Sequence, residues 1–197
     1  MIYLIENPTD YKFKQRATYD HDSSVDMFIF WKGKYISRNQ VDKTILFNLK
    51  ITMQEVLNFD EIINDSNCLL ASKKVVSILS KLVPEEVQFF DAKIKCKDGI
   101  LTDYKLINIT QTVQGIDYEK SIYNWIGDQA DGIISLKRLV LKNDCMNGYK
   151  IARLEEFHGH MLATEEIKQA FEFARVTSLR FVTPEDYYSS IYPNYAE

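Results

Sequence analysis

The chain has 197 residues, of which 46% are hydrophobic and 13% aromatic, and a formal net charge of −4. This length and composition are typical of one compact globular domain and exclude a disordered chain. The acidic balance is the opposite of the basic face of a nucleic-acid binder, and no apolar run approaches the length of a membrane span. The sequence therefore predicts a protein that contacts neither nucleic acid nor membrane.

The three cysteines, Cys68, Cys96 and Cys145, are far apart and odd in number. This spacing indicates neither a disulfide framework nor a zinc ribbon, so reduced thiols are expected. The N-terminus lacks the basic flank and the length of a signal peptide. We therefore expect a cytoplasmic location.

Residues 1–64 give the weakest signals and are predicted to form a separate N-terminal lobe. Residues 2–5 and 44–50 are apolar enough for two strands. The segment "MFIFWKGKYIS", residues 27–37, is aromatic around a Lys-Gly-Lys turn and predicts a small hairpin.

The pattern sharpens over residues 65–197, which are predicted to form the main domain. Helical spacing predicts a helix that begins at Ser66 or Asn67 and ends before Pro84. Residues 90–96 alternate as a half-buried strand, Asp98-Gly99 is a hairpin turn, and residues 104–113 return as a second strand.

Two more strands are predicted at residues 132–142 and 149–156. Thr164 is a favourable N-cap for a helix with an apolar stripe, and residues 178–182 form a short closing strand before a tyrosine-rich, acidic tail. The order of elements lacks βαβ alternation. It predicts an α+β fold with a mostly antiparallel sheet and two main helices.

His158 and His160 are the most reactive-looking pair in the chain. They suit either a metal or catalytic site, as in a small metal-dependent enzyme, or a polar connector before the helix capped at Thr164. A zinc site needs three or four ligands, and the candidates in the sequence stand at no recognised metal spacing. Those candidates are His21, Asp144, Cys145, Glu155 and Glu156. The connector is favoured, and no catalytic residue or cofactor is predicted.

The segment "IDYEKSIYNWIGDQADG", residues 116–132, combines acids and aromatics between two predicted strands. Aromatic side chains supply binding area and acidic charge steers association, so this segment is a candidate surface for a basic protein partner. The candidate interface residues are Asp117, Tyr118, Glu119, Tyr123, Trp125, Asp128 and Asp131, with Tyr187 and Tyr188 of the tail.

Two alternatives stay open for these residues. Trp125 and Ile126 could fold into the core while the acids merely solvate the loop, and the tyrosines of the tail could pin it to the body. The tail could also mediate self-association in a structural protein. The sequence does not fix an oligomeric state.

A series of segments in order resembles a known family: "LSKLVPEEVQFFDAKI", "YKLINITQTVQGIDYEKS", "ISLKRLVLK" and "GYKIARLEEFHGHMLATEEIKQAFEFARVTSLRFV". Together they are similar to the immunity-protein-11 family of bacterial polymorphic-toxin systems, over roughly residues 65–185. The resemblance implies a cytoplasmic, non-enzymatic antidote that binds a cognate toxin. It brings no catalytic motif to carry over.

Overall fold

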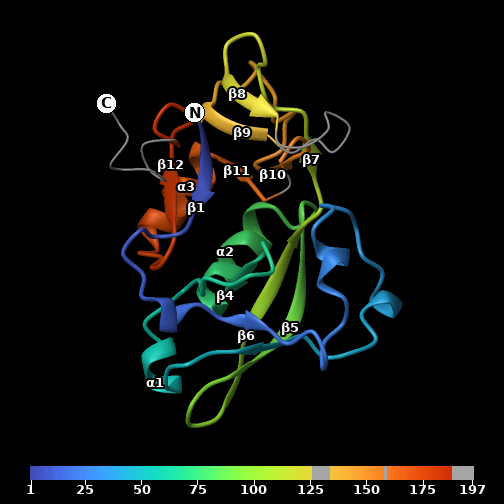
Figure 1. Ribbon diagram of the computed structural model, residues 1–197, viewed down its shortest axis with the longest axis vertical. Helices are drawn as coiled ribbons and strands as arrows, with labels where there is room; N and C mark the ends of the chain where they lie inside the picture. The colour runs from blue at the N-terminus through green and yellow to red at the C-terminus, as the bar shows by residue number, and fades with distance from the viewer. Residues whose placement is uncertain (126–133, 158, 188–197) are drawn as a thin grey trace.

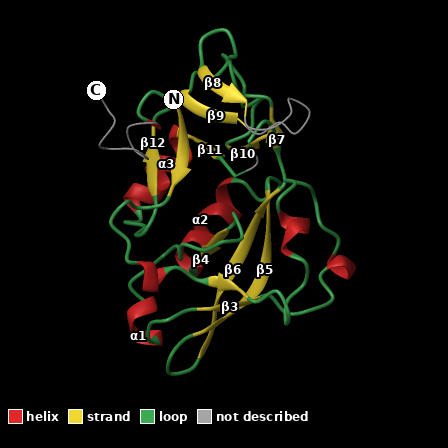
Figure 2. Cartoon of the chain, viewed as in Figure 1, coloured by secondary structure: helices red, strands yellow, loops and turns green. Residues whose placement is uncertain are grey.

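The computed structural model describes residues 1–125, 134–157 and 159–187, and its strands form two five-stranded sheets and a hairpin (Figures 1 and 2). The first sheet, here called the β1 sheet, has the order β12 (Arg180–Val182), β1 (Ile2–Glu6), β11 (Met161–Thr164), β10 (Ile151–Leu154) and β7 (Thr112–Val113). The second, the β5 sheet, has the order β2 (Thr18–Tyr19), β3 (Leu46–Asn48), β5 (Val87–Lys95), β6 (Ile100–Ile109) and β4 (Leu69–Ala71). The hairpin pairs β8 (Ile122–Trp125) with β9 (Ile134–Arg138).

Most strand pairs are antiparallel, and the parallel ones join β7 to β10 and β3 to β5. Among the described residues, three α-helices accompany the strands: α1 (Met53–Val56), α2 (Lys73–Leu82) and α3 (Glu165–Phe173). Single 3-10 turns occur at η1 (Phe13–Gln15), η2 (Met27–Phe30) and η3 (Arg38–Gln40). The predicted α+β class, with a mostly antiparallel sheet and two main helices, is confirmed.

The two main helices join the sheets. Helix α2 packs on the β5 sheet, α3 packs on the β1 sheet, and the helices contact each other. Val75 and Leu79 of α2 share one buried cluster with Ile167 and Phe171 of α3. Since burying a large aliphatic or aromatic side chain contributes about 1.5–3 kcal/mol, this shared cluster holds the two halves of the molecule together.

The other face of each sheet has its own cluster. Phe30, Ile36 and Phe47 belong to the cluster that covers the β5 sheet with segments from the first third of the chain. Leu136 of β9 and Tyr187 belong to the cluster on the β1 sheet. The molecule is therefore layered, with the helices in the middle and a separate core outside each sheet.

Three local predictions were wrong. Residues 27–30 form the turn η2 instead of a hairpin strand. Asp26 Oδ1 caps this turn by accepting a hydrogen bond from Phe28 N at 3.0 Å, and the turn buries the side chains of Met27 and Phe30. Helix α2 begins after Ser72 rather than at residue 66 or 67, because residues 69–71 pair with β6 as β4. The expected connector before α3 contains strand β11, which lies between β1 and β10.

A fourth prediction, of one strand over residues 104–113, was also wrong, because β6 ends at Ile109 in the β5 sheet and residues 112–113 form β7 in the β1 sheet. Several other elements lie close to their predicted places. Strands β1, β3, β5, β10 and β12 lie where the sequence places them, and Thr164 is the N-cap residue of α3, although its side chain makes no capping hydrogen bond. Segments on both sides of residue 64 contribute to each sheet, since β1 pairs with β11 and β12, and β3 pairs with β5. A division between residues 1–64 and 65–197 stays a prediction.

Candidate functional site

The predicted protein-binding segment begins with a tight turn built by Asp117. Its Oδ1 accepts hydrogen bonds from Glu119 N at 3.1 Å and Lys120 N at 3.2 Å, and its Oδ2 lies 2.8 Å from Lys120 Nζ. The Lys120 hydrogen bond is the main cause that lowers the pKa of Asp117. The carboxylate of Asp117 therefore organises the turn, and much of its hydrogen-bonding capacity is used locally.

The aromatic residues of this segment form a pair. The rings of Tyr118 and Tyr123 meet edge to face with centroids 5.3 Å apart, and Tyr118 is 37% exposed. Glu119 is exposed beside them, and Ile122 at the start of β8 is 49% exposed. We refer to Asp117, Tyr118, Glu119, Ile122 and Tyr123 as the acidic-aromatic turn.

The structure brings four of the predicted interface residues together in this turn. The roles of the other predicted residues stay predictions. Trp125 ends strand β8, which pairs with β9. Asp128, Asp131 and Ile126 lie outside the described residues, so the alternative in which Ile126 folds into the core is untested. Tyr188 also lies outside the described residues.

Tyr187 is buried in this structure, with 7% of its surface exposed. Its hydroxyl lies 2.7 Å from His160 Nε2, and its side chain joins the apolar cluster on the β1 sheet. Tyr187 therefore pins the start of the tail to the body, as the alternative proposed for the tail tyrosines expected. Its place in a partner interface stays a prediction, and contact there would require the tail to lift.

His160 is held among neighbours that leave it neutral. Its ring stacks on Phe157 with centroids 4.4 Å apart, and Nδ1 lies 3.8 Å from Glu6 Oε1. Burial lowers the pKa of His160 to about 4 and raises that of Glu6 to about 7. The contact between them is therefore not an ion pair at neutral pH, and any pH sensitivity near 6.5 cannot come from His160.

The candidate metal ligands do not assemble around His160. Glu156 instead accepts hydrogen bonds from Gly115 N at 3.2 Å and Ile116 N at 3.0 Å, and Cys145 lies in an apolar cluster. His158 lies outside the described residues. Within residues 1–125, 134–157 and 159–187, no group of three or more histidine, cysteine or carboxylate side chains could hold a metal ion.

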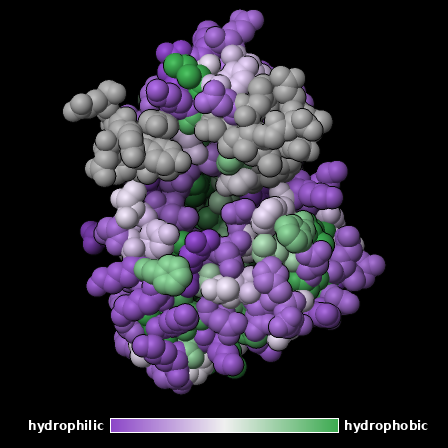
Figure 3. All heavy atoms as spheres, in the orientation of Figure 1, coloured by the Kyte–Doolittle hydropathy of each residue, from purple (hydrophilic) through white to green (hydrophobic). Residues whose placement is uncertain are grey.

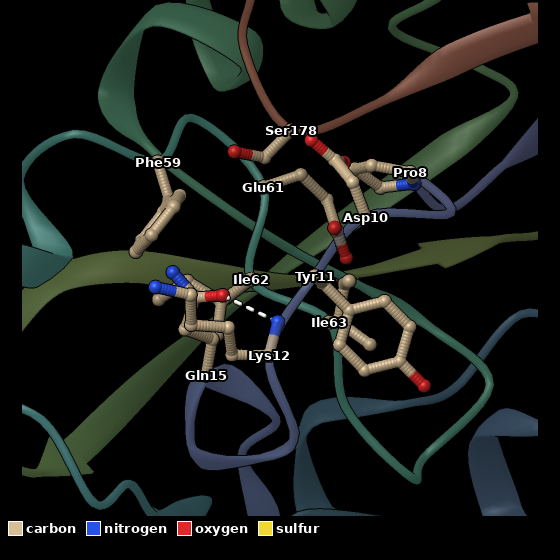
Figure 4. A pocket seen from close by; sticks show the side chains of 10 residues that line it. All are labelled: Pro8, Asp10, Tyr11, Lys12, Gln15, Phe59, Glu61, Ile62, Ile63 and Ser178. Carbon is tan, nitrogen blue, oxygen red and sulfur yellow. Dashed lines mark hydrogen bonds between the residues drawn. The ribbon is translucent and has the colours of Figure 1, made fainter.

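Sequence analysis missed a pocket of about 420 Å³ beside the start of the chain (Figure 4). We call it the Glu61 pocket, and its lining comprises Pro8, Asp10, Tyr11, Lys12, Gln15, Phe59, Glu61, Ile62, Ile63 and Ser178. Glu61 is 4% exposed, and its Oε2 atom has no hydrogen-bond partner. Burial raises the pKa of Glu61 to about 8, so its carboxyl group is largely protonated at neutral pH.

Asp60, the acid that precedes Glu61 in the chain, has partners for both of its carboxylate oxygens. Asp60 makes an ion pair of 2.7 Å with Lys74 Nζ, and it accepts hydrogen bonds from Ser72 Oγ at 2.8 Å and Thr177 N at 3.0 Å. The only sequence signal for Glu61 is an acid in the run "FDEII", where Asp60 is equally acidic. The sequence could not tell which of the two carboxyl groups would be paired.

A second cavity of about 250 Å³ lies on another side of Glu61 and also contains Glu6, Cys68 and His160. The Cys68 thiol accepts a hydrogen bond from Arg153 Nη2 at 3.3 Å, and burial raises its pKa. A raised thiol pKa leaves little of the reactive thiolate, so this cysteine is poorly suited to nucleophilic attack.

The face in Figure 3 is mostly hydrophilic, with apolar side chains gathered in small groups. Through the ranges that the structure describes, we find no helix long and apolar enough to cross a membrane.

Aromatic side chains such as Tyr118 are enriched at the centres of protein interfaces. The chain matches the model described as Immunity protein family (Imm11) over residues 2–186, and it belongs to that family. The match extends the resemblance beyond residues 65–185 to nearly the whole chain, including strands β1 to β3. Membership implies a toxin partner in general. A search of the curated proteins found no match.

Proposed function

We propose that this protein binds a cognate bacterial toxin domain and neutralises it by occlusion, in the cytoplasm and without catalysis. The observation that carries the proposal is the family match over residues 2–186. Occlusion requires no reactive group in the antidote, since a bound partner surface is closed to its own substrate. The proposal therefore needs a binding surface and neither a cofactor nor a nucleic-acid contact.

The acidic-aromatic turn is the surface that we assign to the toxin. Tyr118 and Tyr123 offer a pair of rings that are already in contact, so little side-chain entropy is lost on binding. Glu119 adds exposed acidic charge, and the net charge of −4 favours a basic partner. Trp125, Asp128 and Asp131 complete the interface proposed from the sequence.

Co-expression with the product of the adjacent toxin gene tests the proposal. We expect cells that express the toxin domain to grow only when this protein is present, and the two chains to co-purify. Growth arrest despite abundant folded antidote, with no complex formed, would contradict the proposal.

The interface itself is tested by reversing the charge of one side chain. Glu119→Lys is expected to weaken toxin affinity and to slow association most at low salt, because exposed charges act chiefly through steering. Glu172→Lys is a matched control, since Glu172 is an exposed acid on α3. Equal losses in both variants would place the binding surface elsewhere.

A further inference from the structure

One oxygen of the Glu61 carboxyl group has no hydrogen-bond donor, although the group also has a backbone hydrogen bond at Leu70. Glu61 Oε2 is buried without a hydrogen-bond partner, and Figure 4 shows the carboxyl group directed into the pocket toward the Tyr11 side chain. Leaving a buried polar atom unsatisfied costs about 1–3 kcal/mol, so the arrangement is unfavourable unless a donor enters the pocket. We propose that this pocket binds the guanidinium or ammonium group of an organic cation, with Glu61 as its principal acceptor.

The rest of the lining suits such a cation. Asp10 supplies a second carboxylate at the exposed side, and Tyr11 and Phe59 supply aromatic rings, whose faces attract cations. Lys12 is the basic residue of the lining, and its side chain is exposed. With Glu61 ionised, the lining therefore has one more negative charge than positive.

The volume favours an organic cation over a bare metal ion. A pocket of about 420 Å³ belongs to the size range of small-molecule sites, whereas a metal ion needs several ligands within 2–2.6 Å of one point. An alkylguanidinium group is planar and can donate two parallel hydrogen bonds to one carboxylate.

Binding of a cation would be coupled to release of a proton. The carboxyl group of Glu61 is protonated before binding because burial raises its pKa to about 8. The entering cation stabilises the carboxylate, so the proton leaves to solvent as the guanidinium takes its place. Affinity should therefore fall about tenfold for each pH unit below 8. The other titratable groups around Glu61 are Asp10, Tyr11 and Lys12 in this pocket and Glu6, Cys68 and His160 in the second cavity.

The cation has two possible sources, a basic side chain of a protein or a free small amine. A protein source is favoured by two exposed apolar residues that neighbour lining residues in the chain, since Phe13, next to Lys12, is 81% exposed and Leu57, two residues before Phe59, is 60% exposed. The proposal does not depend on the toxin, since it follows from the pocket alone.

Titration of the full chain with ethylguanidinium, followed by backbone NMR, tests the proposal. We expect saturable shifts at Glu61, Ile62 and Ile63, with a dissociation constant on the order of 1 mM at pH 8. N-ethylurea, which is neutral and similar in shape, should bind at least about tenfold more weakly. Equal binding of the two probes, or no binding of either, would overturn the proposal.

Variants separate the pocket from the fold. Glu61→Gln keeps the shape of the side chain and should weaken ethylguanidinium binding by about 10- to 100-fold. Glu6→Gln, in the second cavity only, should leave it unchanged. If Glu61→Gln fails to fold, Asp10→Asn supplies the second test, with an expected loss of about threefold. Unchanged binding in folded Glu61→Gln would exclude Glu61 as the acceptor, and unchanged binding in Asp10→Asn would exclude a charged site in this pocket.

A final pair of probes identifies the source. N-acetyl-arginine amide presents the guanidinium as a polypeptide does, and putrescine presents ammonium groups as a free amine does. Binding of the blocked arginine as strongly as ethylguanidinium supports a protein side chain. Binding of putrescine with exclusion of the blocked arginine supports a free amine. Failure of the toxin complex would leave these results unaffected, so the two proposals fail separately.

Discussion

The acidic-aromatic turn and the Glu61 pocket place carboxylates in opposite situations. In the turn, Asp117 accepts two backbone hydrogen bonds and contacts Lys120, so its charge is satisfied by its own neighbours. In the pocket, Glu61 is 4% exposed and one of its oxygens has no hydrogen-bond partner. Asp117, which lies in the acidic segment that the sequence pointed to, is therefore a structural residue. Glu61, which the sequence did not point to, keeps an oxygen that can accept a hydrogen bond from a ligand.

The difference has an energetic basis. A carboxylate at a turn is solvated and hydrogen-bonded, so its ionised form is stable and the fold gains from it. A buried carboxyl group with one unpartnered oxygen favours its protonated form, and burying that polar oxygen costs stability in the free protein. Natural proteins retain such costs mainly at functional sites.

The largest expected effect is on stability, through Glu61→Gln. The folded pKa of Glu61 is raised from 4.5 to about 8, so between those values the unfolded chain ionises while the native state keeps its proton. Native stability is therefore lost as pH rises from 4.5 toward 8. Because glutamine does not ionise, the variant should be more stable than the parent by about 3 kcal/mol at pH 7 and by little at pH 4.

Urea unfolding of both proteins at a series of pH values measures this difference. Glu119→Gln in the turn is the control, and it should stay within about 0.5 kcal/mol of the parent throughout because Glu119 is exposed. A Glu61→Gln variant with the same pH profile as the parent would show that the carboxyl is already paired.

The second effect concerns toxin affinity. Tyr118→Ala removes the exposed ring of the pair, and we expect binding to the cognate toxin to weaken by about tenfold or more, mainly through faster dissociation. Phe173→Ala is the matched control, since Phe173 is 93% exposed on α3. Surface plasmon resonance distinguishes them, and a larger loss in Phe173→Ala would move the interface to that helix.

A third effect tests whether Asp117 is structural. Asp117→Ala removes the acceptor of the Glu119 N–H and the side-chain acceptor of the Lys120 N–H, as loss of a helix cap does. Lys120 N keeps a longer hydrogen bond, of 3.3 Å, to the backbone oxygen of residue 117. We expect the Tm to fall by about 2–4 °C in differential scanning calorimetry. Glu119→Ala should shift it far less. Equal shifts would mean that the turn is held by other contacts.

Regular patterns in the sequence predict much of this fold. Alternation along residues 90–96 gives β5, and Thr164 before an apolar stripe gives α3, because both depend on local geometry. Strand β11 was missed because its first three residues are apolar without alternation and its last residue, Thr164, is also the N-cap of α3. Its role is set by β1, which lies about 160 residues away and pairs with it.

The candidate sites, too, could be predicted only where their residues are adjacent in the chain. His160 looks reactive in the sequence, but burial against Phe157 and Tyr187 makes it a neutral structural residue. The turn at Asp117 could be recognised because its residues are adjacent in the chain. The Glu61 pocket could not, since its lining joins residues 8–15, 59–63 and Ser178, which only the tertiary structure brings together.

The smallest expected effect is Asp10→Asn, and it separates binding from stability most cleanly. Asp10 is exposed at the pocket, so its removal should leave the free energy of unfolding within about 0.5 kcal/mol of the parent. Ethylguanidinium affinity should still fall about threefold, because a partly solvated charge contributes modestly to attraction. Asp22→Asn, an exposed acid on another loop, should change neither quantity. A loss shared by both variants would indicate general screening of the net charge. A loss confined to Asp10 would locate the attraction in the pocket, where the unpaired acid already lies.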